Sequence, residues 1–446
     1  MNLKAVEAHA PQPPLTKRKV FMYQKTDLPN GLRVVSYEMK DRDSISIGIW
    51  INAGGRYEED KVKGAAHFLE HILFKGTKNY SCEAIKELIE GVGGMLNAFT
   101  SEENTCYFAK VPAKHLNQTF DVLADMVLSP LITKEDVDKE RGVILEEIKM
   151  YHDLPQHFVL ELLDELVWPD HPLGKNLAGS FETVGQMSEK DLQGFHRGQY
   201  ISKNIVVAAC GKFKHKDLLK LVTRKFRNQA KKQTESFLKF ENRQNSPQVK
   251  LFRKDIEQMH LALGMHGLPY DHKDKYILNL LHVILGANMS SRLFDEVREK
   301  RGLAYAIGSS VKSLQDTGLF MVRAGVDNKK IVEAVKVILE ELSKIKKENV
   351  TKDEFTRAKD YYLGQILLGL EDTLEHMLWL GESVTALNKT RTLKDILKEV
   401  KKIEISDIRR VAGQILNENH FNLSVVGPLA ESQEKDLRRL VGVSGS

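Results

Sequence analysis

The chain has 446 residues, of which 42% are hydrophobic, and its basic and acidic residues are interspersed with a formal net charge of only +5. A chain of this length can form two or more globular domains, and it lacks an apolar run of about 18 residues that a membrane helix would need. The weak and evenly mixed charge gives no case for a nucleic-acid-binding protein.

The first residues and the cysteines bear on the cellular compartment. Residues 1–22 hold three prolines and few large apolar side chains, so we expect a flexible lead-in. This stretch has neither the apolar core of a secretory signal nor the Arg- and Ser-rich character of a mitochondrial presequence. Three cysteines without metal-ligand spacing fit buried thiols in a reducing compartment. We therefore favour a bacterial-type cytoplasmic protein over one of the mitochondrial matrix.

Two strands and a loop precede the most informative stretch of the chain. Residues 32–37 and 44–51 alternate or run apolar, as strands do, and an Asn-Gly pair marks the turn before the first. A loop at 53–56 then leads to residues 64–74, which read Gly-Ala-Ala-His-Phe-Leu-Glu-His-Ile-Leu-Phe. This stretch predicts a helix with little solvated face, because most of its side chains are apolar.

The three polar residues of this helix predict half of a metal site. Residues four apart share a helix face, so His67 and His71 would lie one above the other, with Glu70 beside them. Two imidazoles so spaced can hold one metal ion, and the carboxylate can reach a water molecule next to it. The order H-x-x-E-H is the inverted form of a metallopeptidase signature. A chance match on a surface helix is the alternative, but the apolar flanks leave these polar atoms in need of a partner.

A catalytic zinc needs a third protein ligand and keeps one position open. The segment 133–152 is the best source, because Thr133 reads as an N-cap and a helix should follow it. Glu140 and Glu147 are two turns apart and share a face, whereas Glu146 is rotated away from Glu147. Spacing alone leaves a solvated helix face as the alternative for each of these carboxylates.

The motif His67-Phe-Leu-Glu-His71, followed by Glu147 in the setting Glu-Arg-Gly-Val-Ile-Leu-Glu-Glu-Ile, resembles the pitrilysin family of zinc metallopeptidases, M16. That family includes insulin-degrading enzyme, the mitochondrial processing peptidase and short bacterial relatives, and the resemblance extends over nearly the whole chain. It implies that His67, His71 and Glu147 bind one Zn²⁺ per chain, that Glu70 is the general base and that Glu140 orients a ligand. Such ligands also accept manganese or cobalt, so the metal in the cell stays open.

A predicted β-hairpin follows the metal helix. Residues 93–100 and 105–111 have strand-like character and are joined by a short polar turn. An exposed sheet edge can bind an extended peptide as an additional strand. The family resemblance implies that Asn97, Ala98 and Phe99 form such a substrate-binding strand. An ordinary structural hairpin is the alternative.

The rest of the chain indicates an internal duplication. Helices are expected at about 81–90, 113–128, 134–152 and 156–167. A buried strand at 204–211 is repeated in character at 422–427. We predict an α+β fold of two homologous α/β-sandwich halves, each with a mixed, largely antiparallel sheet covered by helices. The predicted divisions are a flexible segment 1–22, a zinc-binding domain 23–228, a linker 229–246, a C-terminal domain 247–440 without a zinc site, and a flexible tail 441–446.

The second half keeps the helix but loses the metal motif. Aligning residues 275–285 with 64–74 places Leu278 opposite His67 and Leu281 opposite Glu70, so that only His282 remains. We expect His282 to be a core or edge histidine without a metal.

A second family motif lies beyond that helix. Arg298 and Tyr305 resemble the family's Arg/Tyr pair, which approaches the reacting peptide; a guanidinium can grip a carbonyl and a phenol can donate to an oxyanion. A solvated charge on a helix is the alternative for Arg298. The family's active peptidases enclose substrate in a chamber of four such domains, and this chain supplies two. We predict a homodimer, with a heterodimer of related subunits as the alternative, in which Arg298 and Tyr305 reach the partner's zinc.

The sequence therefore predicts a zinc-dependent endopeptidase that hydrolyses peptides or presequence-like unfolded segments in a chamber formed by a dimer. Two other classes stay open, namely a non-catalytic structural subunit and a zinc-dependent protein that binds peptides without cutting them. We expect peptide substrates, no nucleic acid and no membrane among its partners.

Overall fold

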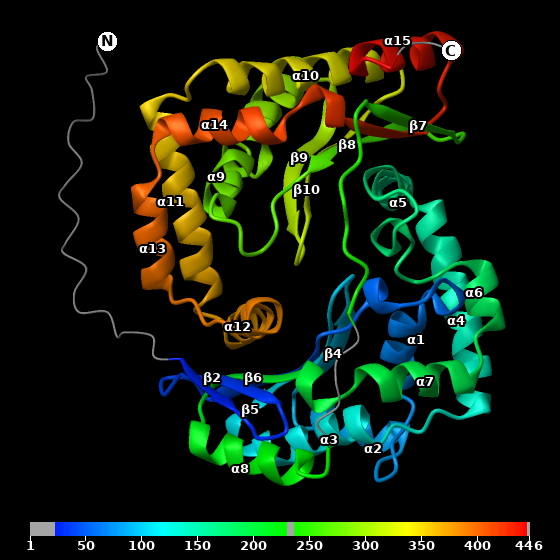
Figure 1. The fold of residues 1–446 in the computed structure, drawn as a ribbon, viewed down its shortest axis with the longest axis vertical. Helices are drawn as coiled ribbons and strands as arrows, with labels where there is room; N and C mark the ends of the chain where they lie inside the picture. The colour runs from blue at the N-terminus through cyan, green and yellow to red at the C-terminus, as the bar shows by residue number, and fades with distance from the viewer. Residues whose placement is uncertain (1–22, 230–235, 444–446) are drawn as a thin grey trace, which may run out of the picture.

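The computed structural model describes residues 23–229 and 236–443. The predicted lead-in 1–22, part of the predicted linker and the end of the predicted tail lie outside these residues. Two sheets, each with helices packed on it, face one another across the middle of the molecule (Figure 1). The domain boundaries drawn from the sequence stay a prediction.

The first sheet has six strands in the order β1-β2-β6-β3-β5-β4. Their bounds are β1 Gln24–Asp27, β2 Arg33–Glu38, β3 Ser44–Ile51, β4 Met95–Thr100, β5 Thr105–Pro112 and β6 Ile205–Gly211. All neighbours are antiparallel except β2 and β6, which are parallel. The predicted hairpin is confirmed as β4 and β5, and β4 forms a free edge of the sheet.

The second sheet repeats the first without its outermost strand. Its order is β7-β11-β8-β10-β9, and only β7 and β11 are parallel. The bounds are β7 Gln248–Arg253, β8 Gln258–His266, β9 Ala304–Ser313, β10 Gly318–Asp327 and β11 Asn422–Gly427. The two orders superimpose with β2, β6, β3, β5 and β4 matched to β7, β11, β8, β10 and β9. The predicted duplication is therefore confirmed, and β9 is the counterpart of the edge strand β4.

The first half contains the helices predicted at about 64–74, 81–90, 113–128, 134–152 and 156–167, and three further helices that were not predicted follow them. Their bounds are α1 Ala65–Ile72, α2 Cys82–Glu90, α3 Leu116–Leu128, α4 Lys134–Asp153, α5 Pro155–Val167, α6 Phe181–Gln186, α7 Glu189–Gln199 and α8 His215–Phe226. Thr133 caps α4 as predicted, because its side chain accepts a hydrogen bond from the amide of Asp136. The helix α1 packs against β4, α4 and α7.

The second half repeats this helical arrangement. Its helices are α9 Lys275–Gly286, α10 Ile331–Lys347, α11 Lys352–Gly369, α12 Thr373–Leu387, α13 Leu393–Lys402, α14 Ile405–Ile415 and α15 Glu431–Val441. The helix α9 packs against β9, α11 and α14, as α1 does against β4, α4 and α7. Among the described residues, none of the helices combines the length and the apolar character required to cross a bilayer.

One helix of each half packs on the sheet of the other half. The helix α5 lies on β8 and β11, and α12 lies on β3 and β6 (Figure 1). Leu163 of α5 joins a buried cluster with side chains of β8 and β11, while Met377 of α12 joins one with Trp50 and other side chains of the first sheet. Each sheet is thus covered on one face by its own half and on the other by its counterpart. This exchange fixes the two halves to each other through apolar burial.

Candidate metal centre

The helix α1 holds its three polar residues on one face of an otherwise buried cylinder. Its other side chains are almost all buried, whereas His67, Glu70 and His71 are partly exposed. The helix starts at Gly64, whose φ of 98° lies in the left-handed region that favours glycine. The buried carboxylate of Glu58 accepts hydrogen bonds from the amides of Gly64 and Ala66, at 3.0 and 2.7 Å. A carboxylate so placed satisfies amides that have no partner within the helix.

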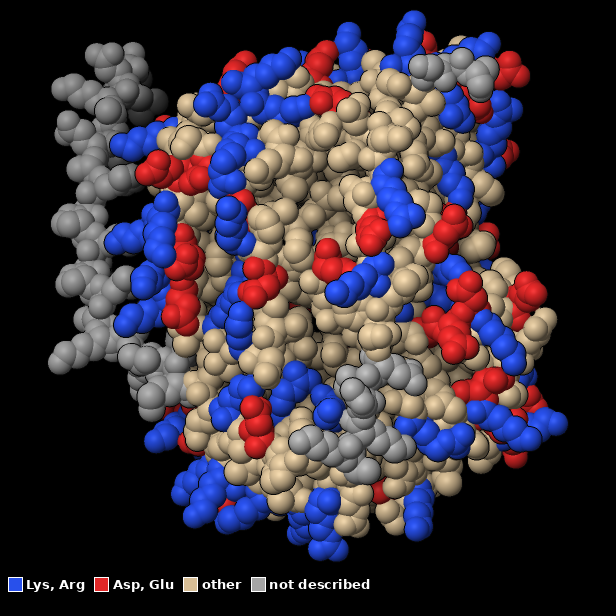
Figure 2. Space-filling view, in the orientation of Figure 1, with Lys and Arg blue, Asp and Glu red and all other residues tan. Residues whose placement is uncertain are grey.

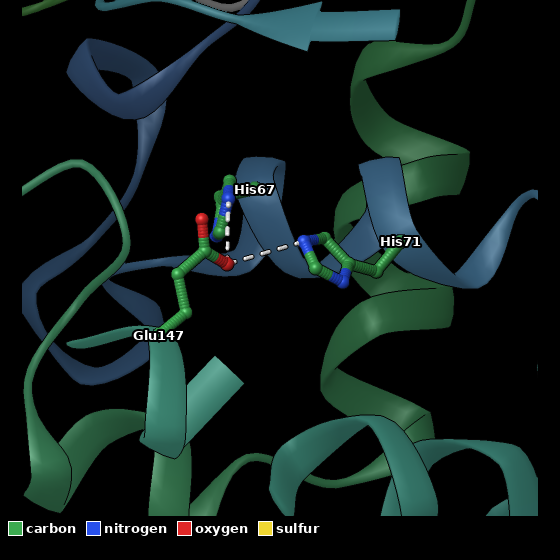
Figure 3. A group of neighbouring side chains, drawn as sticks. All are labelled: His67, His71 and Glu147. Atoms are coloured by element: carbon green, nitrogen blue, oxygen red, sulfur yellow. Dashed lines mark ion pairs between the residues drawn. The ribbon is translucent and has the colours of Figure 1, made fainter. Parts of the chain in front are cut away.

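His67, His71 and Glu147 converge on one point. The Glu147 Oε2 atom lies 3.7 Å from Nε2 of His67 and 3.5 Å from Nε2 of His71. Figure 3 shows the carboxylate reaching from α4 towards both rings of α1. One ligand atom from each residue lies within 4.8 Å of the others, and no other group of this kind occurs in residues 23–229 and 236–443.

The donor set fits a zinc ion. Bonds of about 2.0–2.1 Å arranged tetrahedrally place neighbouring ligand atoms about 3.3 Å apart, close to the 3.7 and 3.5 Å that separate the Glu147 oxygen from the two imidazole nitrogens. Burial lowers the pKa of His67 to about 4, so its ring is neutral at pH 7, as a metal ligand must be. A hydrogen bond with His71 lowers the pKa of Glu147 and keeps it a carboxylate. Three such ligands leave the open position of a catalytic site.

Glu140 lies behind His71 rather than among the ligands. Its Oε2 atom is 3.2 Å from Nδ1 of His71, which leaves the Nε2 atom of that ring directed towards Glu147. Lys75 holds the other oxygen of Glu140, at 2.5 Å. A carboxylate on the far nitrogen fixes the tautomer and orientation of a ligating histidine. This position fits the orienting role expected of Glu140.

Glu70 lies beside this cluster and is hydrogen-bonded to the edge strand. Its Oε2 atom accepts a 2.5 Å hydrogen bond from the hydroxyl of Thr100, at the end of β4. Burial raises the pKa of Glu70, and the bond from Thr100 opposes part of that rise. A carboxylate that is partly desolvated and held beside a metal site is suited to accept a proton.

A cavity of about 480 Å³ opens next to these side chains. His67, Glu70 and Glu147 line it, and so do Ala98 and Phe99 of the predicted substrate strand. The third residue of that strand differs, since Asn97 is exposed and its side chain accepts a bond from the amide of Ala98. The structure therefore brings the free edge of β4 to the metal centre, with Ala98 and Phe99 nearest to it.

Arg298 and Tyr305 are not brought to this cavity within the chain. Arg298 belongs to a π-helical turn, Phe294–Glu299, and its guanidinium lies 4.7 Å from the ring centre of Phe294. Tyr305 stands at the start of β9 and is 52% exposed. The opposite end of β9 is the one that meets the first half, through an ion pair of Lys312 with Glu102.

The described residues of the second half hold no equivalent cluster. His282 of α9 lies 2.7 Å from the hydroxyl of Ser309, and burial lowers its pKa to about 4. Leu278 and Leu281, which stand opposite His67 and Glu70, are buried in the core. The helices α4 and α11 can be aligned at their N-cap residues, Thr133 and Thr351. In this alignment Gln365 of α11 stands at the position of Glu147 in α4. The loss of the site from this half stays a prediction.

Three residues of the site lay outside the sequence-based prediction. Thr100 and Lys75 contact Glu70 and Glu140, and Glu58 caps the metal helix. Lys75 follows His71 by four positions, just after the end of α1, and this spacing was the available signal that the two residues lie close together. Thr100 and Glu58 approach α1 only through the tertiary fold, and their sequence positions carry no periodic signal.

Known proteins resemble the chain over most of its length. The profile of insulinase, peptidase family M16, matches residues 33–180, and that of the peptidase M16 inactive domain matches residues 186–362. An uncharacterized zinc protease of Streptomyces coelicolor is 36% identical over 94% of this chain and 92% of its own length. Uncharacterized zinc proteases of Mycobacterium tuberculosis and Bacillus subtilis are 36% and 33% identical, covering 94% and 91% of this chain and 97% and 98% of their own.

Two solved structures share the fold. A protease from Helicobacter pylori superimposes with a TM-score of 0.87 and 26% identity, over 91% of this chain and all of that one. A structure from Pseudomonas fluorescens described as a peptidase M16 inactive domain has a TM-score of 0.85 over 92% of this chain and 98% of its own. Its identity of 18% supports likeness of fold alone.

Proposed function

Because the chain belongs to the insulinase family, peptidase family M16, we propose that it is a zinc-dependent endopeptidase acting on peptides or presequence-like unfolded segments. The observation that carries this proposal is the convergence of His67, His71 and Glu147 beside the Glu70 carboxylate and a free sheet edge. We propose one Zn²⁺ per chain, because the described residues hold a single cluster of this kind. We also propose a cytoplasmic location of bacterial type; the relatives named above come from bacteria.

Different residues of the chain have different roles in the proposed peptide hydrolysis. A bound zinc ion supplies Lewis acidity that polarises the scissile carbonyl and makes water easier to deprotonate. Glu70 takes the proton of the attacking water and passes it to the leaving amine. Thr100 holds Glu70 in place, and Glu140 with Lys75 holds His71. The edge of β4 binds the peptide backbone as an additional strand, which demands little of the substrate's sequence.

A dimer would complete the active site. Tyr305 and Lys312 are seven positions apart on β9, a distance of about 23 Å in an extended strand. Lys312 lies at the end that meets the first half, so Tyr305 lies at the far end of the strand from this contact. Arg298 and Tyr305 would therefore act on the metal centre of a partner, inside a chamber made by two chains. One chain carries both motifs, which favours a homodimer over a heterodimer of related subunits.

Peptide cleavage with and without metal tests the proposal. The zinc-loaded protein should cleave an internally quenched peptide, and a chelator should abolish the cleavage. Glu70→Gln should retain zinc and lose at least 100-fold in kcat, because the base is gone while the ligands stay. An undiminished kcat in this variant would contradict the role of Glu70. Bound zinc without cleavage would instead indicate a peptide-binding protein, and absence of zinc a structural subunit.

Mixing two inactive variants tests the shared site. His71→Ala removes a ligand from one chain, and Tyr305→Phe removes the phenol from the other. In a homodimer with shared sites, the mixture should regain up to about a quarter of wild-type activity, because only some dimers combine an intact metal centre with an intact partner tyrosine. A mixture as inactive as both parents would contradict sharing.

A further inference from the structure

The tips of two equivalent hairpins meet between the halves. The turn 101–104 joins β4 to β5, and a turn of the second half joins β9 to β10, the counterparts of these strands. Gln315 of the second turn donates its backbone N–H to both carboxylate oxygens of Glu103, at 3.1 Å each. Lys312, near the end of β9, pairs with Glu102 at 2.7 Å. Both acidic residues of the first turn are therefore held by the second half.

The β4–β5 turn is also fastened to the loop that leads into the metal helix. The carbonyl of Ser101 accepts a hydrogen bond from the amide of Gly55, at 3.2 Å. The carbonyl of Glu102 accepts one from the amide of Arg56, at 2.7 Å. A Cβ atom built on Gly54 would lie 2.1 Å from the carbonyl oxygen of Ser101, so the approach leaves no room for a side chain there. The turn thus connects the second half to both β4 and the start of α1.

The ion pair of Lys312 with Glu102 differs from the pairs of the outer surface. Charges of both signs are mixed over the face of the molecule seen in Figure 2, and exposed pairs of this kind hold their partners weakly. The side chains of Lys312 and Glu102 are only 29% and 23% exposed, and Asp164 of α5 lies 3.5 Å from the same ammonium group. Solvent and salt screen a partly buried pair much less. This pair can therefore restrain the β4–β5 turn.

The restrained turn begins directly after the residue that holds the proposed base. Thr100 is the last residue of β4, two positions before Glu102, and its hydroxyl donates the 2.5 Å hydrogen bond to Glu70. A shift of the turn would carry this hydroxyl away from the carboxylate. A general base is efficient only while it is held in its productive geometry.

We propose that Lys312 is a positioning residue for the catalytic base, and that it acts through Glu102 and Thr100. The proposal rests on the proposed function, because it takes Glu70 as the base. Lys312 is not among the residues that line the metal cavity, so its loss should change kcat rather than KM. The half that carries no metal ligands thus sets the geometry of the base within its own chain.

Steady-state kinetics on one internally quenched peptide tests this role in the full, zinc-loaded chain. Lys312→Met removes the charge at similar length and should lower kcat about five- to tenfold, with KM and zinc content nearly unchanged. Lys312→Arg retains a cation beside Glu102 and should recover kcat to within about threefold of wild type. Lys110→Met is the matched control, because it breaks another ion pair between the halves, the 2.6 Å contact with Asp372. It should leave kcat within about twofold of wild type.

Double variants show whether Lys312 acts through the two residues named. Glu102→Gln should lower kcat as much as Lys312→Met, and combining the two should cost less than about twofold more. In a Thr100→Val background, where the bond to Glu70 is already lost, Lys312→Met should also cost less than about twofold. Effects that multiply in either pair would overturn the proposal, and so would a loss that lies entirely in KM. Should Lys312→Met fail to fold, Glu102→Gln with Thr100→Val provides the same comparison.

Amide hydrogen exchange measures the same restraint without catalysis. Residues 97–104 should exchange about tenfold faster in Lys312→Met than in wild type, whereas Lys110→Met should leave this segment unchanged. Faster exchange in a chain that cleaves no peptide would sustain the hold of Lys312 on Thr100 and reject the peptidase. Cleavage by the wild type at a kcat that Lys312→Met leaves intact would sustain the peptidase and reject the positioning role. Unchanged exchange in Lys312→Met would also overturn that role.

Discussion

The hydroxyl of Thr100 donates a 2.5 Å hydrogen bond to Oε2 of Glu70, and so joins the edge strand that would bind substrate to the carboxylate that would move the proton. Thr100 lines the same cavity as Glu70, His67 and Glu147. The position of the base is thereby tied to the strand that aligns the peptide, because one side chain connects the two. Small displacements of a catalytic group reduce rates strongly.

Thr100→Val should lower kcat about 10- to 100-fold with little change in KM, because Glu70 loses the partner that holds it. Thr100→Ser keeps the hydroxyl and should restore kcat to within a few-fold of wild type. Steady-state kinetics on one quenched peptide measures both, with zinc content as the control for an intact metal centre. Equal kcat for Val and Ser variants would show that the bond does not position Glu70.

Arg56 links the two halves at a buried position. Its side chain is fully buried, and Nη1 lies 2.6 Å from Glu103 and 2.7 Å from Asp316 of the second half. Arg56→Met should lower the free energy of unfolding by about 3–5 kcal/mol, because it leaves the buried Glu103 carboxylate without its partner. Denaturant unfolding measures the change. Arg243→Met, in an exposed ion pair, is the control and should stay within about 0.5 kcal/mol of wild type.

Gly381 is the point where α12 meets the first sheet. A Cβ atom built on it would lie 2.1 Å from Nε1 of Trp50, so α12 or the indole must move to accept one. Gly381→Ala should therefore destabilise the fold by about 1–3 kcal/mol. Gly364 of α11 has open space around it, and Gly364→Ala should instead stabilise by about 0.5–1 kcal/mol. Thermal unfolding midpoints that moved in the same direction for both variants would argue against close packing at Gly381.

The ionisation of Asp164 should lower the free energy of unfolding as pH rises. Burial raises its pKa to about 6, although Lys312 lies 3.5 Å away and opposes the rise. An unfolded aspartate titrates near pH 3.9, so the folded chain retains a proton that the unfolded chain has lost. The stability that this proton provides is complete below about pH 4 and is lost as pH rises through about 6.

Asp164→Asn cannot ionise, so the difference in melting temperature between this variant and wild type should increase from pH 4 to pH 7. Asp43→Asn is the control, because the Lys212 partner of that exposed carboxyl lowers its pKa. No increase is expected for Asp43→Asn over the same range. A constant difference for Asp164→Asn would contradict the raised pKa of Asp164.

The spacing of polar and apolar residues along the sequence was sufficient to predict the metal helix and the secondary structure around it. The spacing of His67, Glu70 and His71 fixes a shared face in any helix, and Thr133 marked the start of the helix that carries Glu147. The choice of Glu147 over its neighbours came from family resemblance, because a single helix has several acidic residues on its exposed surface. Its place between the two histidines is a property of how α4 packs on α1.

The packing of α5 on the second sheet and of α12 on the first sheet was not predicted. Apolar periodicity shows that a helix has a buried face, but it does not indicate which sheet covers that face. The contacts of Met377 with the first sheet and Leu163 with the second join residues hundreds of positions apart. The buried Arg56 and its partner Asp316 were missed for the same reason, since each reads in the sequence as an ordinary loop charge.

Zinc content tests the central claim most directly. Purified wild-type protein should contain about one zinc ion per chain by plasma emission spectrometry, and so should His282→Ala, which alters the counterpart histidine of the second half. His71→Ala and Glu147→Ala should each contain almost none at equal protein concentration and equal helical content. Full zinc occupancy in both of these variants, or loss of zinc from His282→Ala alone, would contradict a metal centre built from His67, His71 and Glu147.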